Sequence, residues 1–203
     1  GKMIFGLANT SNYENFDTSK IYFKTKNNVI ILDLNFSKKI IKNLITDNYK
    51  NNQIMVCGTS PLKIKKIKYL LNKIDVLTLN YKEMLNLTNK KNINEAIKMI
   101  REINNKLTIA ITNGSKKIIC IHKNFFYEAN CPKIKVKNDN GAGDTFSSVF
   151  FGEISKNSSI EHALKKSVAA GCLSSRGINL NQIKDYKTYL NQFSKKINVI
   201  KKL

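Results

Sequence analysis

Apolar residues along the chain follow two patterns, short continuous runs and longer stretches in which they recur every three or four positions. Short runs rich in β-branched residues are typical of buried strands, and the second spacing is typical of amphipathic helices. The runs predict strands at residues 29–33, 53–57, 75–78 and 107–112, the first of them fully buried. The helical spacing predicts helices through Ile40, Ile41, Leu44 and Ile45, from Pro61 through Leu62, Ile64, Ile67, Leu70 and Leu71, and over residues 80–87 and 93–103.

The pattern changes after the turn signal Asn113-Gly114. Short strands without intervening helices are expected at residues 118–121, 125–128 and 134–136, which indicates an antiparallel edge. Helices are expected over residues 141–154, 160–173 and 183–193. Strands that alternate with helices predict an α/β fold, here with a mainly parallel sheet flanked by helices. Since the sequence has no internal repeat and no flexible linker, we expect one domain over residues 1–203.

Length and composition agree with this expectation. A chain of 203 residues that is 42% hydrophobic can bury one sizeable core. It has no run near the roughly 18 apolar residues of a membrane-spanning helix, and its start lacks the apolar region of a signal peptide, so we expect a soluble, cytoplasmic protein. The four cysteines lie far apart and only two histidines accompany them, which favours free thiols over a metal site. The cysteines are Cys57, Cys120, Cys131 and Cys172.

The charge is strongly positive, with 35 basic and 14 acidic residues and a net charge of +21. Such a balance ordinarily suggests a polyanionic partner such as nucleic acid. Here the basic residues are mostly Lys, are spread along the chain and occur with many Asn and Ile, as in Lys90-Lys91-Asn92-Ile93. Because A+T-rich codons encode these residue types, composition bias explains the charge. A nucleic-acid reader more often has clustered Arg or interleaved aromatics, so we do not expect nucleic acid as the main partner.

Candidate chemistry is concentrated in the segment Asn138-Asp139-Asn140-Gly141-Ala142-Gly143-Asp144-Thr145-Phe146, which leads into a predicted helix. The first amides of a helix have no internal partner and lie at the positive end of its dipole, so Gly141, Ala142 and Gly143 can bind an anion. In phosphoryl transfer that anion is the phosphate in flight. Asp144 would then lie beside it and accept a hydroxyl proton as general base. The alternative from these residues alone is a tight turn with an acidic residue at a helix N-terminus.

The pattern Gly-Ala-Gly-Asp-Thr-Phe at residues 141–146 resembles the second signature of the ribokinase family, the PfkB carbohydrate kinases. A second match occurs earlier in the chain, as the family order requires. Residues 77–83 resemble the T-P-N-x-x-E element of these kinases, although Leu79 stands in place of Pro. The resemblance implies that Asn80 and Glu83 help to organise Mg²⁺ and phosphate.

Two further segments resemble the nucleotide-binding part of these kinases. Thr112 and Gly114 match a T-x-G-x-x-G turn that contacts the nucleotide, although Lys117 stands where the last glycine is expected. Ala169-Ala170-Gly171-Cys172 is similar to the small-residue helix that borders the adenine, with Gly171 as the candidate contact. Small residues also permit close helix packing, and that alternative stays open for each of them.

Within the family the sequence is most similar to pseudouridine kinases. Asp33 and Asn35 fall in a segment that resembles their D-x-N-L-S element and are candidate substrate-proximal residues, as is Asn138, which stands where ribokinases and fructokinases usually have Asp. Residues 1–13 resemble the strand before this element. Cys57-Gly58-Thr59 departs from the pattern, because it replaces a D-P-V segment. Asp33 is alternatively a strand-end residue that caps the following turn.

The resemblance implies an ATP-dependent kinase with Mg²⁺ bridging the phosphates, no direct protein ligand to the metal, and a monovalent cation as a further candidate cofactor. Asp144 would deprotonate a hydroxyl of a small-molecule substrate, most closely the 5′-hydroxyl of pseudouridine, with a ribokinase- or fructokinase-like sugar kinase as the alternative. A homodimer is compatible with the family. The chain begins inside the family pattern, without the glycine-rich sugar-binding element and most of the lid. A fragment, an internal start in a decaying gene and a second polypeptide that completes the enzyme all stay open. The third alternative for the function is an inactive remnant that binds nucleotide or RNA through its charge.

Overall fold

The computed structural model describes residue 17, residues 26–177 and residues 183–202. The chain forms two compact units, Gly6–Ile109 and Ala110–Leu203 with Gly1–Phe5. We describe each unit by itself. The single domain over residues 1–203 stays a prediction, because two compact units within a chain do not test it. The predicted strand in residues 1–13 lies outside the described residues.

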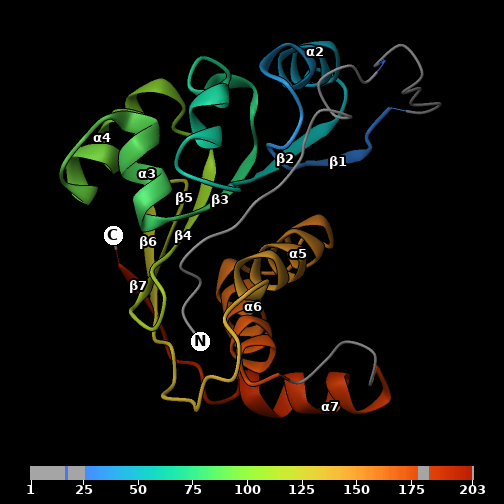
Figure 1. Ribbon diagram of the computed structural model, residues 1–203, viewed down its shortest axis with the longest axis vertical. Helices are drawn as coiled ribbons and strands as arrows, with labels where there is room; N and C mark the ends of the chain where they lie inside the picture. Colours follow the sequence, from blue (N-terminus) through green and yellow to red (C-terminus); the bar gives the residue numbers. More distant parts are fainter. Residues whose placement is uncertain (1–16, 18–25, 178–182, 203) are drawn as a thin grey trace. The chain divides into compact units, whose positions relative to one another are not determined.

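The unit Gly6–Ile109 is built of parallel strands and helices in alternation, as predicted (Figure 1). Strand β1 pairs in parallel with β2, and β2 with β3, so that Ile31 lies opposite Met55 and Val56 opposite Leu77. Its strands are β1 (Val29–Leu32), β2 (Gln53–Cys57) and β3 (Val76–Asn80), and its helices are α2 (Lys38–Asn48), α3 (Tyr81–Thr88) and α4 (Ile93–Ile103). Strand β4 (Thr108–Thr112) leads the chain into the other unit.

Two expectations for this unit are wrong in detail. The helix expected from Pro61 is instead a pair of short 3₁₀ helices, η2 (Lys63–Ile67) and η3 (Leu71–Lys73), and Leu62 is 80% exposed. The buried residues of this segment include Ile64, Ile67 and Leu70. A spacing of three suits the 3.0-residue turn of a 3₁₀ helix better than an α-helix. Strand β1 is not fully buried, because its residues alternate and Val29 and Ile31 are exposed.

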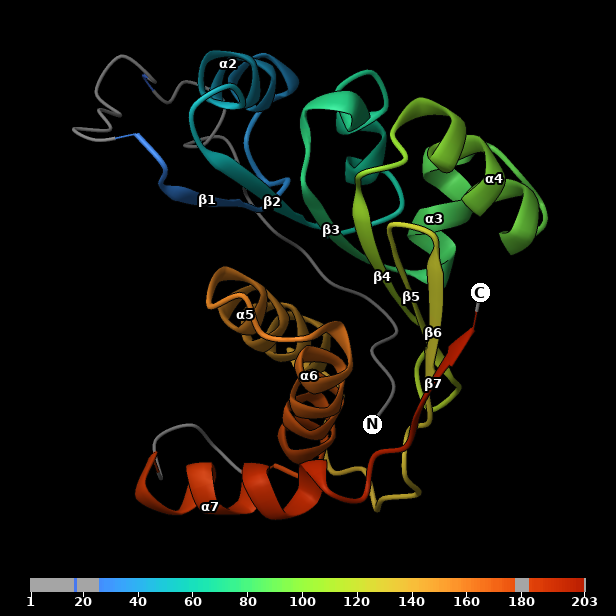
Figure 2. The same cartoon turned by 180° about the vertical axis from the view of Figure 1, so that it is seen from behind.

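In its described residues, 110–177 and 183–202, the second unit has antiparallel strands and three helices (Figure 2). The strands are β5 (Ile118–His122), β6 (Phe125–Ala129) and β7 (Val199–Lys202), and the helices are α5 (Ala142–Ser155), α6 (Ile160–Ser175) and α7 (Ile183–Ser194). The antiparallel edge is confirmed, but the strand predicted at residues 134–136 is wrong. Strand β6 pairs with β5 on one side and with β7 on the other. After residues 134–136, the N–H groups of Lys137 and Asn138 donate to the carbonyl of Ser175 at 2.8 and 3.2 Å.

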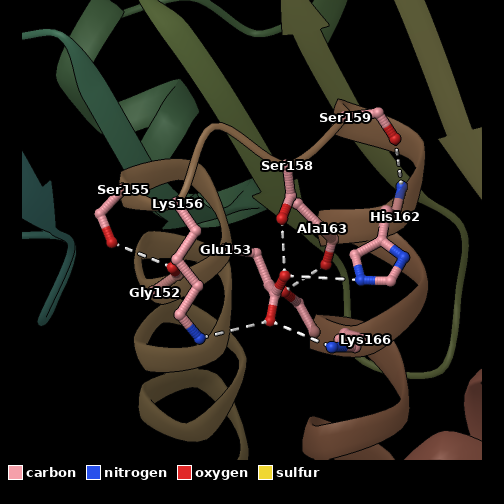
Figure 3. Close-up of polar contacts among 10 residues, drawn as sticks. Gly152, Glu153, Ser155, Lys156, Ser158, Ser159, His162, Ala163 and Lys166 are labelled. Carbon is pink, nitrogen blue, oxygen red and sulfur yellow. Dashed lines mark hydrogen bonds and ion pairs between the residues drawn. The ribbon is translucent and has the colours of Figure 1, made fainter.

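Helices α5 and α6 lie side by side and are joined by residues 156–159 (Figures 1 and 2). Near their connection, Glu153 is 8% exposed and accepts hydrogen bonds from Ser158 Oγ at 2.8 Å and Lys166 Nζ at 3.3 Å (Figure 3). His162 Nε2 lies 3.5 Å from the same carboxylate. This cluster on Glu153 holds the C-terminal end of α5 against α6. Among the described residues, no helix combines the length and the apolar composition that crossing a bilayer requires.

Candidate functional site

The site begins at the N-terminus of α5, where Gly141 has a φ of 75° in the left-handed region that favours glycine. The Asp139 carbonyl accepts the Ala142 N–H at 3.3 Å, which closes the turn before the helix. No side chain caps this helix. Because the next amides, of Gly143 and Asp144, belong to the first helical turn, they have no carbonyl four residues back to bond. Of the three predicted anion-binding residues, Gly143 is therefore the one best placed to donate.

Asp144 is exposed and is the acidic residue of the first turn of α5. The hydroxyls around it are committed to backbone carbonyls: Thr145 Oγ1 donates to Gly141 at 2.9 Å and Ser148 Oγ to Asp144 itself at 2.8 Å. Its carboxylate makes no hydrogen bond or ion pair within the described part of the chain. A solvent-facing carboxylate beside helix amides can accept a proton from a bound hydroxyl.

A cavity of about 250 Å³ adjoins this helix start within the second unit. Five predicted residues line it: Thr112, Gly114, Ala142, Gly143 and Gly171. They come from the end of β4, the turn that follows, the N-terminus of α5 and the middle of α6. The structure therefore brings the predicted nucleotide residues together with part of the predicted anion site.

Gly171 permits the close approach of α6 to the start of α5. A Cβ at this position would lie 3.2 Å from the Ala142 carbonyl oxygen and 3.7 Å from Phe146 Cβ. The first distance is tighter than ordinary van der Waals contact, so a side chain would push the two helices apart or shift the turn. Gly171 therefore lines the cavity and is also a packing residue, and its contact with the adenine stays a prediction.

Sequence reasoning missed several residues of the cavity. On α6 these are Val168 and Ser175, which with Gly171 lie at helical spacing of three and four on one face. That periodicity was available in the sequence as a signal. Asp139, which also lines the cavity, and Cys131, which follows β6, carried no such signal because neither belongs to a regular element.

Three predicted residues of this unit lie outside the cavity lining. Gly141 and Asp144 are immediate neighbours of lining residues in the chain. Asn138 is exposed, and its side-chain oxygen accepts the Asn140 N–H at 3.0 Å. Lys117 Nζ, at the position of the absent glycine, forms an ion pair with Glu128 at 3.0 Å. This pair bridges β6 and the residue just before β5.

In the unit Gly6–Ile109, Asn80 and Glu83 bond to each other at the start of α3. The Asn80 side chain accepts the Glu83 N–H at 3.0 Å, and Glu83 Oε2 accepts the Asn80 N–H at 2.8 Å. This reciprocal arrangement is a capping box. Glu83 is only 3% exposed. Its role toward Mg²⁺ and phosphate stays a prediction, and the structure gives it a structural role as well.

Asp33 and Asn35 also bond to each other, in the loop that follows β1. Asp33 Oδ1 accepts the Asn35 N–H at 2.8 Å, and Asp33 Oδ2 accepts from Asn35 Nδ2 at 3.0 Å. Lys63 Nζ donates to Asn35 Oδ1 at 2.6 Å, and Lys66 Nζ donates to the Leu34 carbonyl at 2.9 Å. The loop is therefore tied to η2. The alternative in which Asp33 caps a turn fits these bonds, and the substrate role stays a prediction.

Direct protein ligands to a metal were not expected from the sequence. Across the described residues, no three His, Cys, Asp or Glu side chains gather closely enough to hold a metal ion. Mg²⁺ commonly binds through one or two carboxylates, substrate phosphates and water. The expectation that no protein side chain binds the metal directly stays a prediction.

The pfkB family carbohydrate kinase model matches residues 7–183. The fold is similar to a carbohydrate kinase from Agrobacterium tumefaciens, with a TM-score of 0.74, 19% identity, and 98% of this chain and 67% of that chain covered. It is similar to ribokinase from Thermotoga maritima, with a TM-score of 0.69, 19% identity, and 83% and 57% covered. Phosphofructokinase-2 from Escherichia coli, solved in complex with potassium, gives a TM-score of 0.68, 20% identity, and 84% and 58% covered.

At these identities the structural similarities establish the α/β ribokinase-like fold, with parallel strands and an antiparallel edge, and thereby confirm the predicted fold class. The chain spans less than two thirds of the length of the ribokinase and of the phosphofructokinase. No curated protein sequence matches it.

Proposed function

Because the chain belongs to the pfkB family of carbohydrate kinases, we propose that it is the ATP-binding and catalytic part of a kinase that phosphorylates a sugar or nucleoside hydroxyl. The observation that carries this proposal is the cavity at the start of α5, which gathers Thr112, Gly114 and Gly171 beside Ala142 and Gly143. These residues belong to separate segments of the sequence and meet at one place. A fortuitous resemblance of one motif would not bring them together.

The cavity suits the two ends of a nucleotide. Ile118, Phe146 and Val168 give it an apolar wall, on which a flat adenine ring can be buried. The amides of Gly143 and Asp144 lie at the helix N-terminus, where the dipole favours phosphate. Adenine would therefore lie against α6, with the phosphates directed toward the first turn of α5.

Asp144 is the proposed general base. The attacking hydroxyl loses its proton to the Asp144 carboxylate as it bonds to the γ-phosphorus of ATP. The charge that develops on the phosphoryl oxygens is stabilised by the first-turn amides of α5, which are fixed before the reaction begins. Bound Mg²⁺ would supply further charge neutralisation, held by phosphate oxygens and water rather than by a protein cluster. A monovalent cation near the site also belongs to the proposal.

The substrate proposed first is pseudouridine, on the resemblance of Asp33, Asn35 and Asn138 to the corresponding elements of pseudouridine kinases. A sugar such as ribose or fructose is the alternative. An inactive remnant that binds nucleotide or RNA is favoured by one observation: Asp33 and Asn35 bond to each other, and Asn35 also bonds to Lys63 of η2. A homodimer likewise stays a prediction.

The test is ATP consumption by the purified chain with Mg²⁺ and pseudouridine, ribose or fructose. We expect turnover with one of them, and a loss of about 100-fold or more in kcat for Asp144→Asn, because the amide cannot accept the proton. ATP binding, measured by calorimetry, should survive in the variant. Asp47→Asn, at an exposed carboxylate on α2, is the matched control and should retain turnover.

The outcomes separate the alternatives. Equal turnover in Asp144→Asn and the parent chain would exclude Asp144 as the base. ATP binding without turnover on any substrate would favour the remnant. Binding to RNA that weakens steeply between low and physiological salt, with no ATP binding, would overturn the kinase proposal.

A further inference from the structure

Two thiols line the same wall of the cavity. Cys172 lies on α6 beside Gly171, and Cys131 lies two residues beyond the end of β6. Each thiol shifts the pKa of the other, and both side chains line this one cavity, so the two thiols are neighbours in its lining. The Cys131 Sγ is also 3.8 Å from the carbonyl oxygen of Gly114, in the predicted nucleotide turn. Neither cysteine is in a disulfide.

The backbone holds this pair in place from both sides. Asn130 N–H donates to the Asn198 carbonyl at 3.2 Å, which extends the β6–β7 pairing up to Cys131. Further along, Lys137 and Asn138 donate to the carbonyl of Ser175, one turn of α6 beyond Cys172. The segment that carries Cys131 is therefore anchored at one end to β7 and at the other to α6. Fixed positions of this kind allow two sulfurs to meet repeatedly in the same geometry.

The two sulfurs differ in character. Interaction with the Cys172 thiol lowers the pKa of the Cys131 thiol, although the partial burial of Cys131 acts in the opposite direction. The pKa of Cys172 is raised, first by that interaction and then by burial. Cys131 is also the more exposed of the two. Since the thiolate is the nucleophile, Cys131 is the sulfur that reacts first with a small oxidant, and Cys172 is the one that resolves the product.

We propose that Cys131 and Cys172 form a redox-sensitive pair, and that their oxidation to a disulfide by a peroxide closes the cavity to nucleotide. The Cys131 thiolate attacks one oxygen of the peroxide, the O–O bond breaks, and Cys131 sulfenic acid and hydroxide form. Cys172 sulfur then bonds to Cys131 sulfur, and the sulfenic oxygen leaves as water with the Cys172 proton. The two thiols lose two electrons in total, and the peroxide gains them.

A disulfide at this place changes the cavity itself. The S–S bond is about 2 Å long, so the Cys131 segment has to move toward α6 and the thiol hydrogen bond to Gly114 is lost. Gly114 and Gly171 line the same cavity as the two cysteines, so the covalent bridge forms beside two predicted nucleotide contacts. The consequence for ATP rests on the proposed function, whereas the formation of the disulfide does not.

Peptide mapping of the full chain tests the first part. After treatment with hydrogen peroxide and alkylation of the remaining thiols, trypsin should release residues 124–133 linked to residues 167–176, because each of these peptides holds one cysteine of the pair. The link should disappear in Cys131→Ser and in Cys172→Ser, and on addition of dithiothreitol. It should persist in Cys57→Ser, the matched control with a partly exposed cysteine on β2.

Binding of ATP to reduced and oxidised protein, measured by calorimetry, tests the second part. We expect oxidation to weaken binding by about tenfold or more in the parent chain and in Cys57→Ser, and to leave it unchanged in Cys172→Ser. An unlinked peptide map, or equal binding by the reduced and the linked protein, would overturn the proposal. If the reduced protein binds no ATP, both the proposed function and the proposed closure of the cavity to nucleotide are overturned. A peptide map that contains the disulfide-linked peptides would still establish the thiol pair.

Discussion

The two units of the chain treat their predicted functional residues differently. In Ala110–Leu203, Thr112, Gly114 and Gly171 surround a cavity, and the carboxylate of Asp144 is exposed without a bonded partner in the described residues. In Gly6–Ile109, the predicted polar side chains bond to each other, as Glu83 does in its capping box. The first arrangement leaves groups available to a ligand. The second uses the same kinds of group to stabilise turns.

This difference shows why a motif match has two physical meanings. A carboxylate or amide that follows a parallel strand can face a ligand, and it can equally cap the next helix. Burial and hydrogen bonding separate the two, because a group with satisfied partners has to lose them before it binds something else. Substitutions in the two units should therefore affect different measurements. Those in Gly6–Ile109 should change stability, and those in Ala110–Leu203 should change ligand binding or turnover.

The largest effect on stability is expected for Glu83→Ala. The change removes the acceptor of the Asn80 N–H, breaks the capping box and leaves a void at the buried position of the Glu83 side chain, so it should lower the free energy of unfolding by about 2 kcal/mol. Urea denaturation followed by circular dichroism measures this. Asp144→Ala is the matched control in the other unit, and its exposed carboxylate should change stability by less than about 0.5 kcal/mol.

Glu83→Gln sharpens the same comparison. Gln keeps a side-chain oxygen for the Asn80 N–H and is accepted in capping boxes, so most of the stability should return. If turnover returns as well, the role of Glu83 is structural. If stability returns without turnover, the negative charge of Glu83 acts on the metal and phosphate. Glu83 would then be a ligand-binding residue in the unit whose polar residues we expect to stabilise turns.

The helices and strands differ in how well the sequence predicts them. Strands β1 to β6 and helices α5 and α6 were predictable, because the strands are short apolar runs and the helices have apolar residues at helical spacing. The 3₁₀ helices at Lys63–Ile67 and Leu71–Lys73 were not, because a spacing of three or four positions also fits an α-helix. Strand β7 was missed because it forms by pairing with the free edge of β6. Pairing between residues about 70 positions apart leaves no local signal in the sequence.

The site shows the same limit. Gly141 was predictable from its motif, since a turn with a φ of 75° needs glycine. The proximity of Cys131 to Cys172 was not, because it depends on how an irregular segment crosses α6. The capping box of Asn80 and Glu83 was visible in the sequence at its spacing of three, but the family resemblance assigned the two residues to phosphate instead.

A smaller effect is expected for Gly171→Ala, which tests whether cavity and packing depend on the same residue. Ala favours a helix interior over Gly by about 1 kcal/mol, but the new methyl group would lie 3.2 Å from the Ala142 carbonyl oxygen. Gly152→Ala is the matched control on α5, where a Cβ meets nothing within 4 Å. We expect Gly152→Ala to raise stability and Gly171→Ala to fall short of it by about 1 kcal/mol in urea denaturation, with ATP binding weakened in Gly171→Ala alone. Equal gains in stability and equal ATP affinity would show that α6 does not press on the start of α5.

The smallest effect concerns the cluster on Glu153, which supports the second unit away from its cavity lining (Figure 3). Burial raises the pKa of this carboxyl, but the hydrogen bonds from Ser158 and Lys166 and the nearby lysine charges outweigh burial and lower it from 4.5. A carboxyl whose pKa is depressed in the folded state stabilises the protein above its unfolded pKa, and that contribution is lost as the pH falls through the folded value. Glu153→Gln should therefore cost about 1 kcal/mol at pH 7 and less at acid pH, measured by urea denaturation at both.

The matched control for Glu153 is Glu161→Gln on α6, whose carboxylate is 53% exposed and pairs with Lys165 at 2.6 Å. Because solvent screens such a pair, its loss should cost no more than about 0.5 kcal/mol at pH 7. If the two variants lose equal stability, or if Glu153→Gln keeps the full pH dependence of the parent chain, the cluster does not hold α5 to α6. A cost for Glu153→Gln that fades toward acid pH, with ATP affinity unchanged, would show that Ala110–Leu203 keeps its stabilising carboxylate apart from its binding residues. In Gly6–Ile109, by contrast, the predicted binding residues themselves form the stabilising bonds.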